Sequence, residues 1–456
     1  MTPPLLALLA FLGLQLGIGV YLSRRIHSES DYLVAGRRLS PLLATFSIFA
    51  TWFGAETVIG SAAMVHGEGL SLASAEPFGY GLCLLLMGAL LARPLWNRGL
   101  TTLADLYRMR FGGGVERLAA LLLVPSSVLW AGAQIRAFGQ VLATVSDLTP
   151  STAIGIAALF VVTYTIFGGM LADAITDVIQ GGVLSIGLGI MLVAVVQEAG
   201  GITASLQLVT TSGKIDLAPT AAGPWYATLE AWAIPVLGSV AATEVVSRVI
   251  AARSADVAQR ASLTAGGLYL AIGSLPVLIA LIGGSFVGPM SDPEQLLPTI
   301  ARDLLPPVFF AIFAGGLISA ILSTVDSTLL VASGLVSHNL LIPFFGISDE
   351  RQKVRLARGG VMTFGLIAYA LALNAEGVFA LVQEASAFGS AGILVTVVGA
   401  LFTTGGSPRT ATATLLGGIL GYVGARAVQI PIPFLTSLGV ALACWTLGWL
   451  LDRVRR

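Results

Sequence analysis

Long apolar runs recur along the whole chain, separated by short segments rich in Arg, Gly and Pro. A run of about 20 apolar residues is long enough to cross a bilayer as a helix. Only 11% of the residues are charged, against about 25% in soluble globular proteins, so a soluble enzyme and a disordered chain are excluded. We predict an all-α polytopic membrane protein of about thirteen transmembrane helices, with cores near 3–23, 41–65, 76–96, 116–145, 150–168, 174–197, 229–252, 261–287, 306–337, 357–374, 378–402, 410–428 and 432–451.

Basic residues are distributed unevenly over the predicted loops. With the N-terminus placed outside, 20 of the 24 Lys and Arg residues fall on the cytoplasmic side, Arg248 among them. Lys214, Arg302 and Arg426 fall outside, and Arg136 lies within a span. Cytoplasmic loops carry the excess of Lys and Arg, so we expect a multi-pass protein of the cell membrane with an external N-terminus and a cytoplasmic C-terminus.

The remaining composition argues against several other classes of protein. The formal net charge is zero, which leaves no basic field for nucleic acid. Cys83 and Cys444 lie in apolar runs, and the three histidines are scattered, so neither a zinc site nor a His-based enzyme site is expected. The lipid bilayer is the partner that the composition predicts, and no obligate protein partner is evident.

The second predicted span, 41–65, carries polar groups near its middle. Gly54 and Glu56 lie there, and a continuous lipid-facing helix would not hold a carboxylate at that depth. An interruption at 51–56 would free backbone carbonyls, which bind cations. The alternative is an uninterrupted helix, made more flexible by Gly54, in which Glu56 has a hydrogen-bonding or charged partner inside the bundle.

The seventh predicted span, 229–252, has a similar weak point. Pro235 and Gly238 interrupt its helical pattern, and the acid Glu244 follows. This span and span 41–65 are each the first of five successive spans. Corresponding broken helices in two halves of a chain indicate an inverted-repeat transporter.

The ninth predicted span, 306–337, carries a stripe of small polar residues at the spacing of one helix face. Such stripes are most often helix packing contacts. Asp326 lies beside the stripe, and the sixth span opens with Asp173 and Asp177, so these acids at membrane depth call for a cation, a proton or a basic side chain. The stripe consists of Ala320, Ser323, Thr324 and Ser327.

Three segments together resemble the sodium:solute symporter family. Residues 30–38 (SDYLVAGRR) resemble its first cytoplasmic loop, 164–172 (YTIFGGMLA) its signature around a double glycine, and 176–180 (TDVIQ) its acid-and-glutamine motif. The resemblance implies a LeuT-type fold with a five-plus-five inverted repeat. The domains would be 1–40 (accessory first helix and cytoplasmic loop), 41–198 (first repeat), 199–228 (external loop), 229–405 (second repeat) and 406–456 (two accessory helices).

The resemblance also implies a sodium site and names Na⁺ as the coupling ion. Five neutral oxygens, suited to a hard monovalent cation, would come from the carbonyls of Ala50, Phe53 and Ala320 and the hydroxyls of Ser323 and Thr324.

Some family members hold a second cation, for which the resemblance points to Asp177, Ser323 and Ser327, with Asp326 adding charge. A purely structural hydrogen bond between these residues is the equal alternative.

The solute is less determined than the ion. Carboxylates in the predicted cavity favour a solute with an amino or quaternary ammonium group, so an amino acid or amine is the first hypothesis. The expected activity is sodium-coupled import of a small organic solute by alternating access, without enzymatic activity; a proton-coupled transporter or a membrane sensor with the same fold are the alternatives. The residues expected to line the cavity are Trp52, Glu56, Thr57, Glu76, Glu244 and Gln383.

Overall fold

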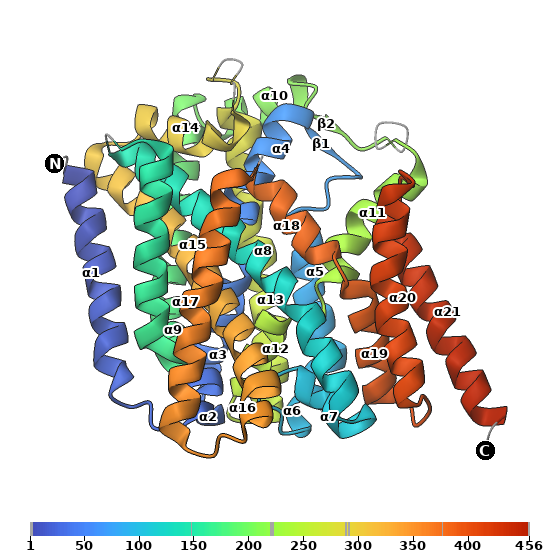
Figure 1. Cartoon of the computed structure of the whole chain (residues 1–456). Helices are drawn as coiled ribbons and strands as arrows, with labels where there is room; N and C mark the ends of the chain where they lie inside the picture. The colour runs from blue at the N-terminus through green and yellow to red at the C-terminus, as the bar shows by residue number, and fades with distance from the viewer. Residues whose placement is uncertain are drawn as a thin grey trace.

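The computed structural model describes residues 3–146, 148–218, 223–287, 290, 292–375 and 377–454, and 83% of it is helical. Its long helices stand side by side, with α1 at one edge and α20 and α21 at the other (Figure 1). The elements up to Glu198 are α1 (Pro3–Ser23), α2 (Glu29–Val34), η1 (Ala35–Arg37), α3 (Pro41–Trp52), η2 (Glu56–Gly60), α4 (Ser61–Glu68), β1 (Leu70–Ser71), α5 (Phe78–Leu86), η3 (Met87–Leu91), α6 (Ala92–Asn97), α7 (Ala104–Phe111), α8 (Gly113–Val145) and α9 (Pro150–Glu198).

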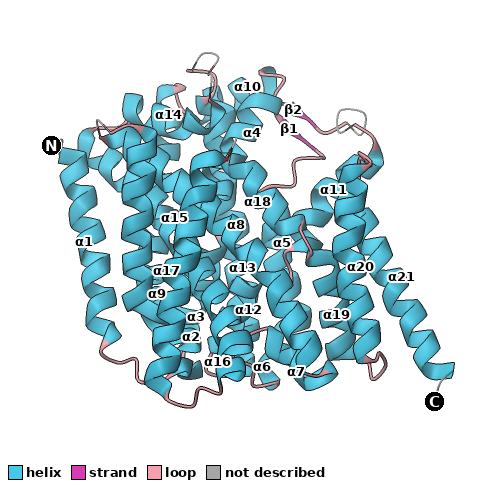
Figure 2. Ribbon diagram, viewed as in Figure 1, coloured by secondary structure: helices cyan, strands magenta, loops and turns pink. Residues whose placement is uncertain are grey.

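The rest of the chain continues the same helical pattern, and Figure 2 shows strand only at β1 and β2 among the described residues. The two strands pair in parallel, Leu70 opposite Ile215. The elements after Glu198 are α10 (Ile202–Thr211), β2 (Ile215–Asp216), α11 (Trp225–Ala233), η4 (Ile234–Gly238), α12 (Thr243–Ala251), α13 (Ala255–Gly283), η5 (Pro293–Gln295), α14 (Leu296–Leu304), α15 (Pro307–Val336), η6 (Ser337–Leu341), α16 (Ile342–Phe345), α17 (Glu350–Asn374), α18 (Val378–Ala387), α19 (Ser390–Phe402), α20 (Pro408–Ala427) and α21 (Pro433–Val454).

The membrane-spanning helices confirm the predicted all-α class. Within the described residues, nine helices are long and apolar enough to cross a bilayer, or up to eleven if each of two bent pairs is one span. The bent pairs are α3 with η2–α4, at 55°, and α18 with α19, at 41°. Thirteen spans remain a prediction, because α20 is not among these helices and α9 covers two predicted spans.

The helix α9 folds back on itself at Gly169. A straight helix would place residues twelve positions apart about 18 Å apart, yet the hydroxyls of Tyr164 and Thr176 lie 2.6 Å from each other. Gly169 has a φ of 59° and a ψ of 179°, a conformation that glycine adopts readily. A Cβ at this position would also lie 2.8 Å from the Tyr32 ring. The two halves of α9 therefore form the two legs of a hairpin, in the places of the predicted spans 150–168 and 174–197.

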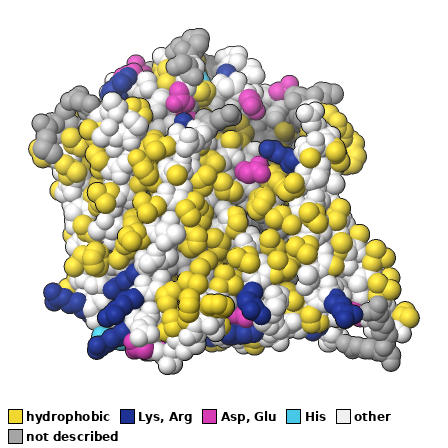
Figure 3. Space-filling model, in the orientation of Figure 1, with side chains coloured by type: hydrophobic (Ala, Val, Ile, Leu, Met, Phe, Trp, Pro, Cys, Tyr) yellow, Lys and Arg dark blue, Asp and Glu magenta, His cyan; other side chains and the backbone are white. Residues whose placement is uncertain are grey.

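The two ends of the bundle differ in charge. The visible face in Figure 3 is mainly hydrophobic across its middle, and its Lys and Arg side chains gather mostly at the lower end. Arg24 and Arg25 follow α1, and Arg351 lies at the start of α17; we call this the arginine-rich end. α1 begins at the opposite end and α21 ends at the arginine-rich end (Figure 1), as an odd number of crossings requires. The assignment of this end to the cytoplasm stays a prediction.

Two segments far apart in the sequence are joined near the arginine-rich end. Leu39, just before α3, donates its N–H to the Ala251 carbonyl at 3.0 Å and accepts from the Arg253 N–H at 3.0 Å. The Trp96 indole donates to the Ala252 carbonyl at 2.7 Å. This Leu39–Ala252 bridge ties the beginning of α3 to the end of α12.

Candidate functional site

The predicted interruption of the second span is confirmed. α3 ends at Trp52, Phe53 leaves the helical conformation with a ψ of 75°, and the chain resumes as the π-helical turn η2 at Glu56. Gly54 lies in the gap, where a Cβ would be 2.5 Å from Glu56 Oε2 and 2.8 Å from Gln134 Nε2. Only glycine lets the Glu56 carboxyl fold back over the break at this distance.

The five predicted sodium ligands lie on two elements that pack together, α15 and the broken end of α3. The Thr324 hydroxyl donates to the Ala320 carbonyl at 3.1 Å, and the Ser323 hydroxyl donates to Asp177 at 2.5 Å. The Ala50 carbonyl accepts the Phe53 N–H at 3.3 Å. Both hydroxyls use their hydrogens as donors, so their oxygen lone pairs remain available to a cation.

A cluster of buried charges lies next to Ser323. Asp173 and Asp177 on α9 and Asp326 on α15 are each at most 3% exposed, and Arg248 on α12 is fully buried. Arg248 forms an ion pair with Asp173. Asp326 interacts with Asp173 through a side-chain hydrogen bond and through charge, and it also interacts electrostatically with Asp177. Three carboxylates and one guanidinium leave an excess of negative charge that requires protons or a cation.

Arg248 corrects an expectation drawn from the sequence. It was counted among the cytoplasmic basic residues, but it lies within the bundle, with its guanidinium donating to Ser327 and, at 2.9 Å, to Ser247. Ser327 also lies 3.1 Å from the Thr51 hydroxyl on α3. Ser327 is thus already bound to Arg248 and to the broken helix.

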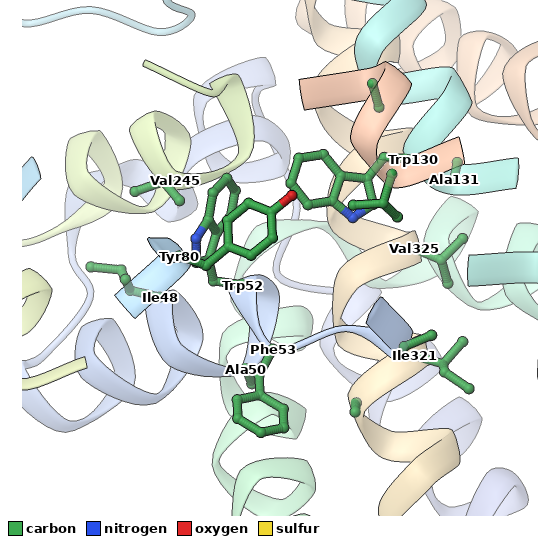
Figure 4. Packing of buried hydrophobic residues seen from close by; sticks show 14 of the residues in the cluster. Ile48, Ala50, Trp52, Phe53, Tyr80, Trp130, Ala131, Val245, Ile321 and Val325 are labelled. Atoms are coloured by element: carbon green, nitrogen blue, oxygen red, sulfur yellow. The ribbon is translucent and has the colours of Figure 1, made fainter. Parts of the chain in front are cut away.

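Three aromatic rings pack together beside the break, as Figure 4 shows for Trp52, Tyr80 and Trp130. The Trp52 ring lies 5.8 Å from Tyr80 and 5.1 Å from Trp130, and Tyr80 lies 6.1 Å from Trp130. The Trp52 indole N–H is buried without a hydrogen-bond partner in the described part of the chain, and the Trp130 indole interacts with the Glu56 carboxyl. We call these three residues the aromatic cluster; they come from α3, α5 and α8.

Gln134 on α8 holds the broken helix in place. Its Oε1 accepts the Ala55 N–H at 3.0 Å, and its Nε2 donates to Glu56 Oε2 at 2.8 Å. Glu56 is fully buried, and its Oε1 has no hydrogen-bond partner among the described residues. Glu56 therefore has partners inside the bundle, as the alternative expected, although the helix is also interrupted beside it.

Glu76, which precedes α5, is bound to the η2 turn that contains Glu56. The Thr57 hydroxyl donates to Glu76 Oε1 at 3.0 Å, and the Tyr269 hydroxyl donates to the same oxygen at 3.5 Å. Tyr269 and Thr57 are also hydrogen-bonded to each other. Thr57, which binds Glu76, directly follows Glu56 in the chain, and the two buried carboxylates interact electrostatically, so both adjoin the η2 turn.

A cavity of about 810 Å³ reaches this region from the end opposite the arginine-rich end. The buried residues Glu76 and Tyr80 line the inner end of the cavity, and the exposed Glu68 lines its outer end. Its charged lining within the described residues is four acids, Glu68, Glu76, Asp292 and Glu294, and the single base Arg136. The field in the cavity therefore favours a positively charged solute.

The residues predicted to line the cavity are divided by the structure. Glu76 and Gln383 line it. Trp52, Glu56 and Thr57 are buried and are not part of its lining. Glu244 lies elsewhere, accepting a 2.5 Å hydrogen bond from Ser127 in a small pocket of about 30 Å³. Trp130 also lines that pocket, so the aromatic cluster separates the large cavity from Glu244.

The sequence-based reading missed Arg248, Tyr80, Trp130, Gln134 and Tyr269. Gln134 and Arg136 are two polar residues in one predicted span, which was a usable signal for a cavity wall. The aromatic residues gave no comparable signal, because aromatic side chains within spans are common packing residues.

A further buried network lies at the arginine-rich end, outside the predicted solute path. The Asp105 carboxylate accepts the N–H groups of Thr101 and Thr102 at 2.8 Å and 3.0 Å and lies 3.2 Å from the His338 ring. Burial alone would raise the pKa of Asp105, but hydrogen bonds and charge from His338, with those backbone groups, outweigh burial and lower it. The carboxylate form of Asp105 therefore stabilises this end of the bundle.

Comparison with known proteins connects this geometry to transport. The model of the sodium:solute symporter family matches residues 32–421. The high-affinity choline transporter 1 of Homo sapiens is 28% identical over 83% of this chain and 69% of its own length. The sodium/pantothenate symporter of Escherichia coli K12 is 25% identical over 74% of this chain and 72% of its own length.

Solved structures support the LeuT-type fold. A sodium-coupled sialic acid symporter, in a substrate-bound outward-open state, aligns with a TM-score of 0.88 at 17% identity, covering 100% of this chain and 98% of that one. The transporter MhsT in complex with L-phenylalanine aligns with a TM-score of 0.56 at 13% identity, covering 91% of this chain and 98% of that one. At these identities the likeness concerns the fold alone.

Proposed function

Because the chain belongs to the sodium:solute symporter family, we propose that it uses sodium to drive import of a cationic solute of the quaternary ammonium type. The family and the relatives are transporters rather than enzymes. The observation that carries the proposed solute class is the acid-lined cavity that ends at the aromatic cluster.

The aromatic cluster and the two glutamates together suit a cation without hydrogen-bond donors. A quaternary ammonium group binds to aromatic faces by cation–π attraction, and Trp52, Tyr80 and Trp130 offer three rings within 6.1 Å of one another. Neither Glu56 nor Glu76 forms an ion pair within the described residues. A bound cation would supply the missing positive charge. Choline, named in the relatives, is a solute of this chemistry.

The proposed first sodium site consists of Ala50, Phe53, Ala320, Ser323 and Thr324. It is supported by the confirmed break at Phe53 and by the free lone pairs of the two hydroxyls. A cation bound there would join α3 to α15. Since solute binding at Trp52 involves the same broken helix, sodium and solute would stabilise each other.

A second cation at Asp177, Asp326, Ser323 and Ser327 is proposed on charge balance. Arg248 neutralises one of the three neighbouring carboxylates, and a sodium ion or a proton would neutralise another. Transport would then move more than one cation with each solute.

Uptake into proteoliposomes tests the solute class. The panel is labelled choline, its uncharged carbon isostere dimethylbutanol, and the zwitterion glycine betaine, each with an inward sodium gradient and with sodium replaced by an inert cation. We expect sodium-dependent uptake of choline and no uptake of the isostere, because the isostere has the same shape but no charge for the cavity to attract. Uptake of dimethylbutanol or of glycine betaine in place of choline would contradict the proposal.

A matched pair of variants tests the aromatic cluster. Trp130→Ala should weaken choline binding by about 0.5–2 kcal/mol, the range of cation–π interactions, which is roughly a 2- to 30-fold rise in Kd. Trp130→Phe keeps an aromatic face and should lose less. Equal losses in the two variants, or none, would remove the cluster from the binding site.

A further inference from the structure

Two acids lie beside the aromatic cluster with too few partners for two negative charges. Glu56 is fully buried and Glu76 is 4% exposed. Glu56 Oε2 accepts from the Gln134 amide, and the carboxyl also interacts with N–H groups of Gly54, Trp130 and its own backbone, none of which carries a positive charge. Two close carboxylates in a poorly solvated site do not both remain ionised.

The surrounding groups offer hydrogen bonds but little positive charge. Glu76 accepts from the uncharged hydroxyls of Thr57 and Tyr269, and Tyr80 is the other titratable group beside it. The acids Glu68, Asp292 and Glu294 line the same cavity as Glu76 and add further negative charge.

Arg136 is the one base in the cavity lining among the described residues. Its guanidinium donates to the Ala372 carbonyl at 3.2 Å, and it has no salt bridge to Glu56 or Glu76 in the part of the chain that the structure describes. It therefore does not neutralise the pair directly.

We propose that Glu56 and Glu76 form a proton-binding site that holds one shared proton while the solute site is empty, and that an arriving cationic solute displaces this proton. This inference rests on the proposed function for the identity of the displacing cation. Glu76 lines the cavity, so the proton leaves from its carboxyl to water there. The solute's positive charge replaces the proton's, and the net charge of the site is unchanged.

The consequence is a competition between protons and solute. Choline binding should release about one proton per protein, and the apparent Kd for choline should rise by up to about tenfold for each pH unit of acidification over the range in which the pair takes up its proton. The same site gives the import cycle an outward proton movement, distinct from any cation bound at Asp177 and Asp326.

The first experiment measures proton release in detergent-solubilised protein. Choline is added with sodium present in weakly buffered solution, and a pH-indicator dye reports the protons released. Wild-type protein should release about one proton, whereas Glu56→Gln and Glu76→Gln should each release fewer, because the remaining buried acid has lost the carboxylate neighbour that favours the proton. Binding of choline to wild-type protein without proton release would overturn the proton site and leave the proposed solute intact.

The second experiment needs no solute. Infrared difference spectra of the empty protein at about pH 7, wild type minus variant, should show the C=O band of one protonated carboxyl for Glu56→Gln and for Glu76→Gln. Glu68→Gln is the matched control, because Glu68 lines the same cavity but is exposed, and it should show no such band. If choline does not bind but the band is found, the proton site stands and the solute assignment fails. If neither glutamate variant shows the band, the shared proton is refuted whatever solute is carried.

Discussion

Replacing Arg248 by Met separates charge balance from packing in the buried cluster. The methionine keeps much of the side chain's length and removes its charge. Arg248 is fully buried and forms an ion pair with Asp173, so its loss leaves three neighbouring carboxylates with no positive side chain. Removing one partner of a buried ion pair costs about 3–5 kcal/mol.

This free energy converts into a measurable melting temperature. Unfolding entropy is about 2.1 cal/mol/K per residue, which over 456 residues is roughly 1 kcal/mol/K. Arg248→Met should therefore lower the apparent Tm by roughly 3–5 °C in sodium-free detergent solution. Arg248→Met with Asp173→Asn is the matched control, and it should recover part of the loss because it removes both charges of the pair.

Sodium should stabilise the single variant more than the wild type, since the cluster then lacks its internal cation. A ligand at about 100 times its Kd adds about 2.7 kcal/mol, or roughly 3 °C by the same conversion. The assay is thermal unfolding with and without sodium, at constant ionic strength. An Arg248→Met variant that melts within about 1 °C of the wild type, with the same response to sodium, would refute the argument that the three carboxylates carry uncompensated charge.

Three further predictions follow from local geometry. Replacing Ser323 and Thr324 together by Ala removes two of five proposed sodium ligands, so the sodium concentration for half-maximal uptake should rise roughly tenfold, about 1.4 kcal/mol; unchanged sodium dependence would reject the site. Gly54→Ala places a methyl group 2.5 Å from Glu56 Oε2 and 2.8 Å from Gln134 Nε2, so both side chains must shift and uptake should fall, whereas Gly67→Ala, on the same bent span with nothing within 4 Å, should not lower it. Because the pKa of Asp105 is lowered, its contribution to stability is present above about pH 4 and is lost as the pH falls through the lowered value; the Tm difference between wild type and Asp105→Asn should therefore be full at neutral pH and vanish in acid, and a difference independent of pH would contradict this.

The features that the sequence predicted well are those set by one segment at a time. Gly54 and Glu56 in the middle of an apolar run predicted the break that the structure shows between Trp52 and Glu56. Pro235 and Gly238 predicted the second irregular segment, which is the π-helical η4 followed by a turn before α12. Local polarity and helix-breaking residues suffice for such predictions.

Features that depend on several helices were predicted less well. Arg248 lies near the end of an apolar run, so the positive-inside rule predicted that it would lie in the cytoplasm. Its ion-pair partner Asp173 lies on another helix, and the sequence of one segment does not show that pairing. Glu244 was expected in the cavity because it follows the second break, but Ser127 on α8 holds it on the far side of Trp130. The division of the chain into two inverted repeats rests on the two broken spans and on the family resemblance, and its domain bounds stay a prediction.

The Leu39–Ala252 bridge limits how the arginine-rich end can open during alternating access. Leu39 lies just before the start of α3, and Ala252 lies just after the end of α12. Opening between these helices would break the two backbone hydrogen bonds of Leu39, each worth about 0.5–1.5 kcal/mol. A rigid-body movement of both helices together would break none. Amide hydrogen exchange at Leu39 and Arg253 distinguishes the two mechanisms: slow exchange throughout the transport cycle means that the two broken helices rock as one body, and the gate must then open along their outer sides.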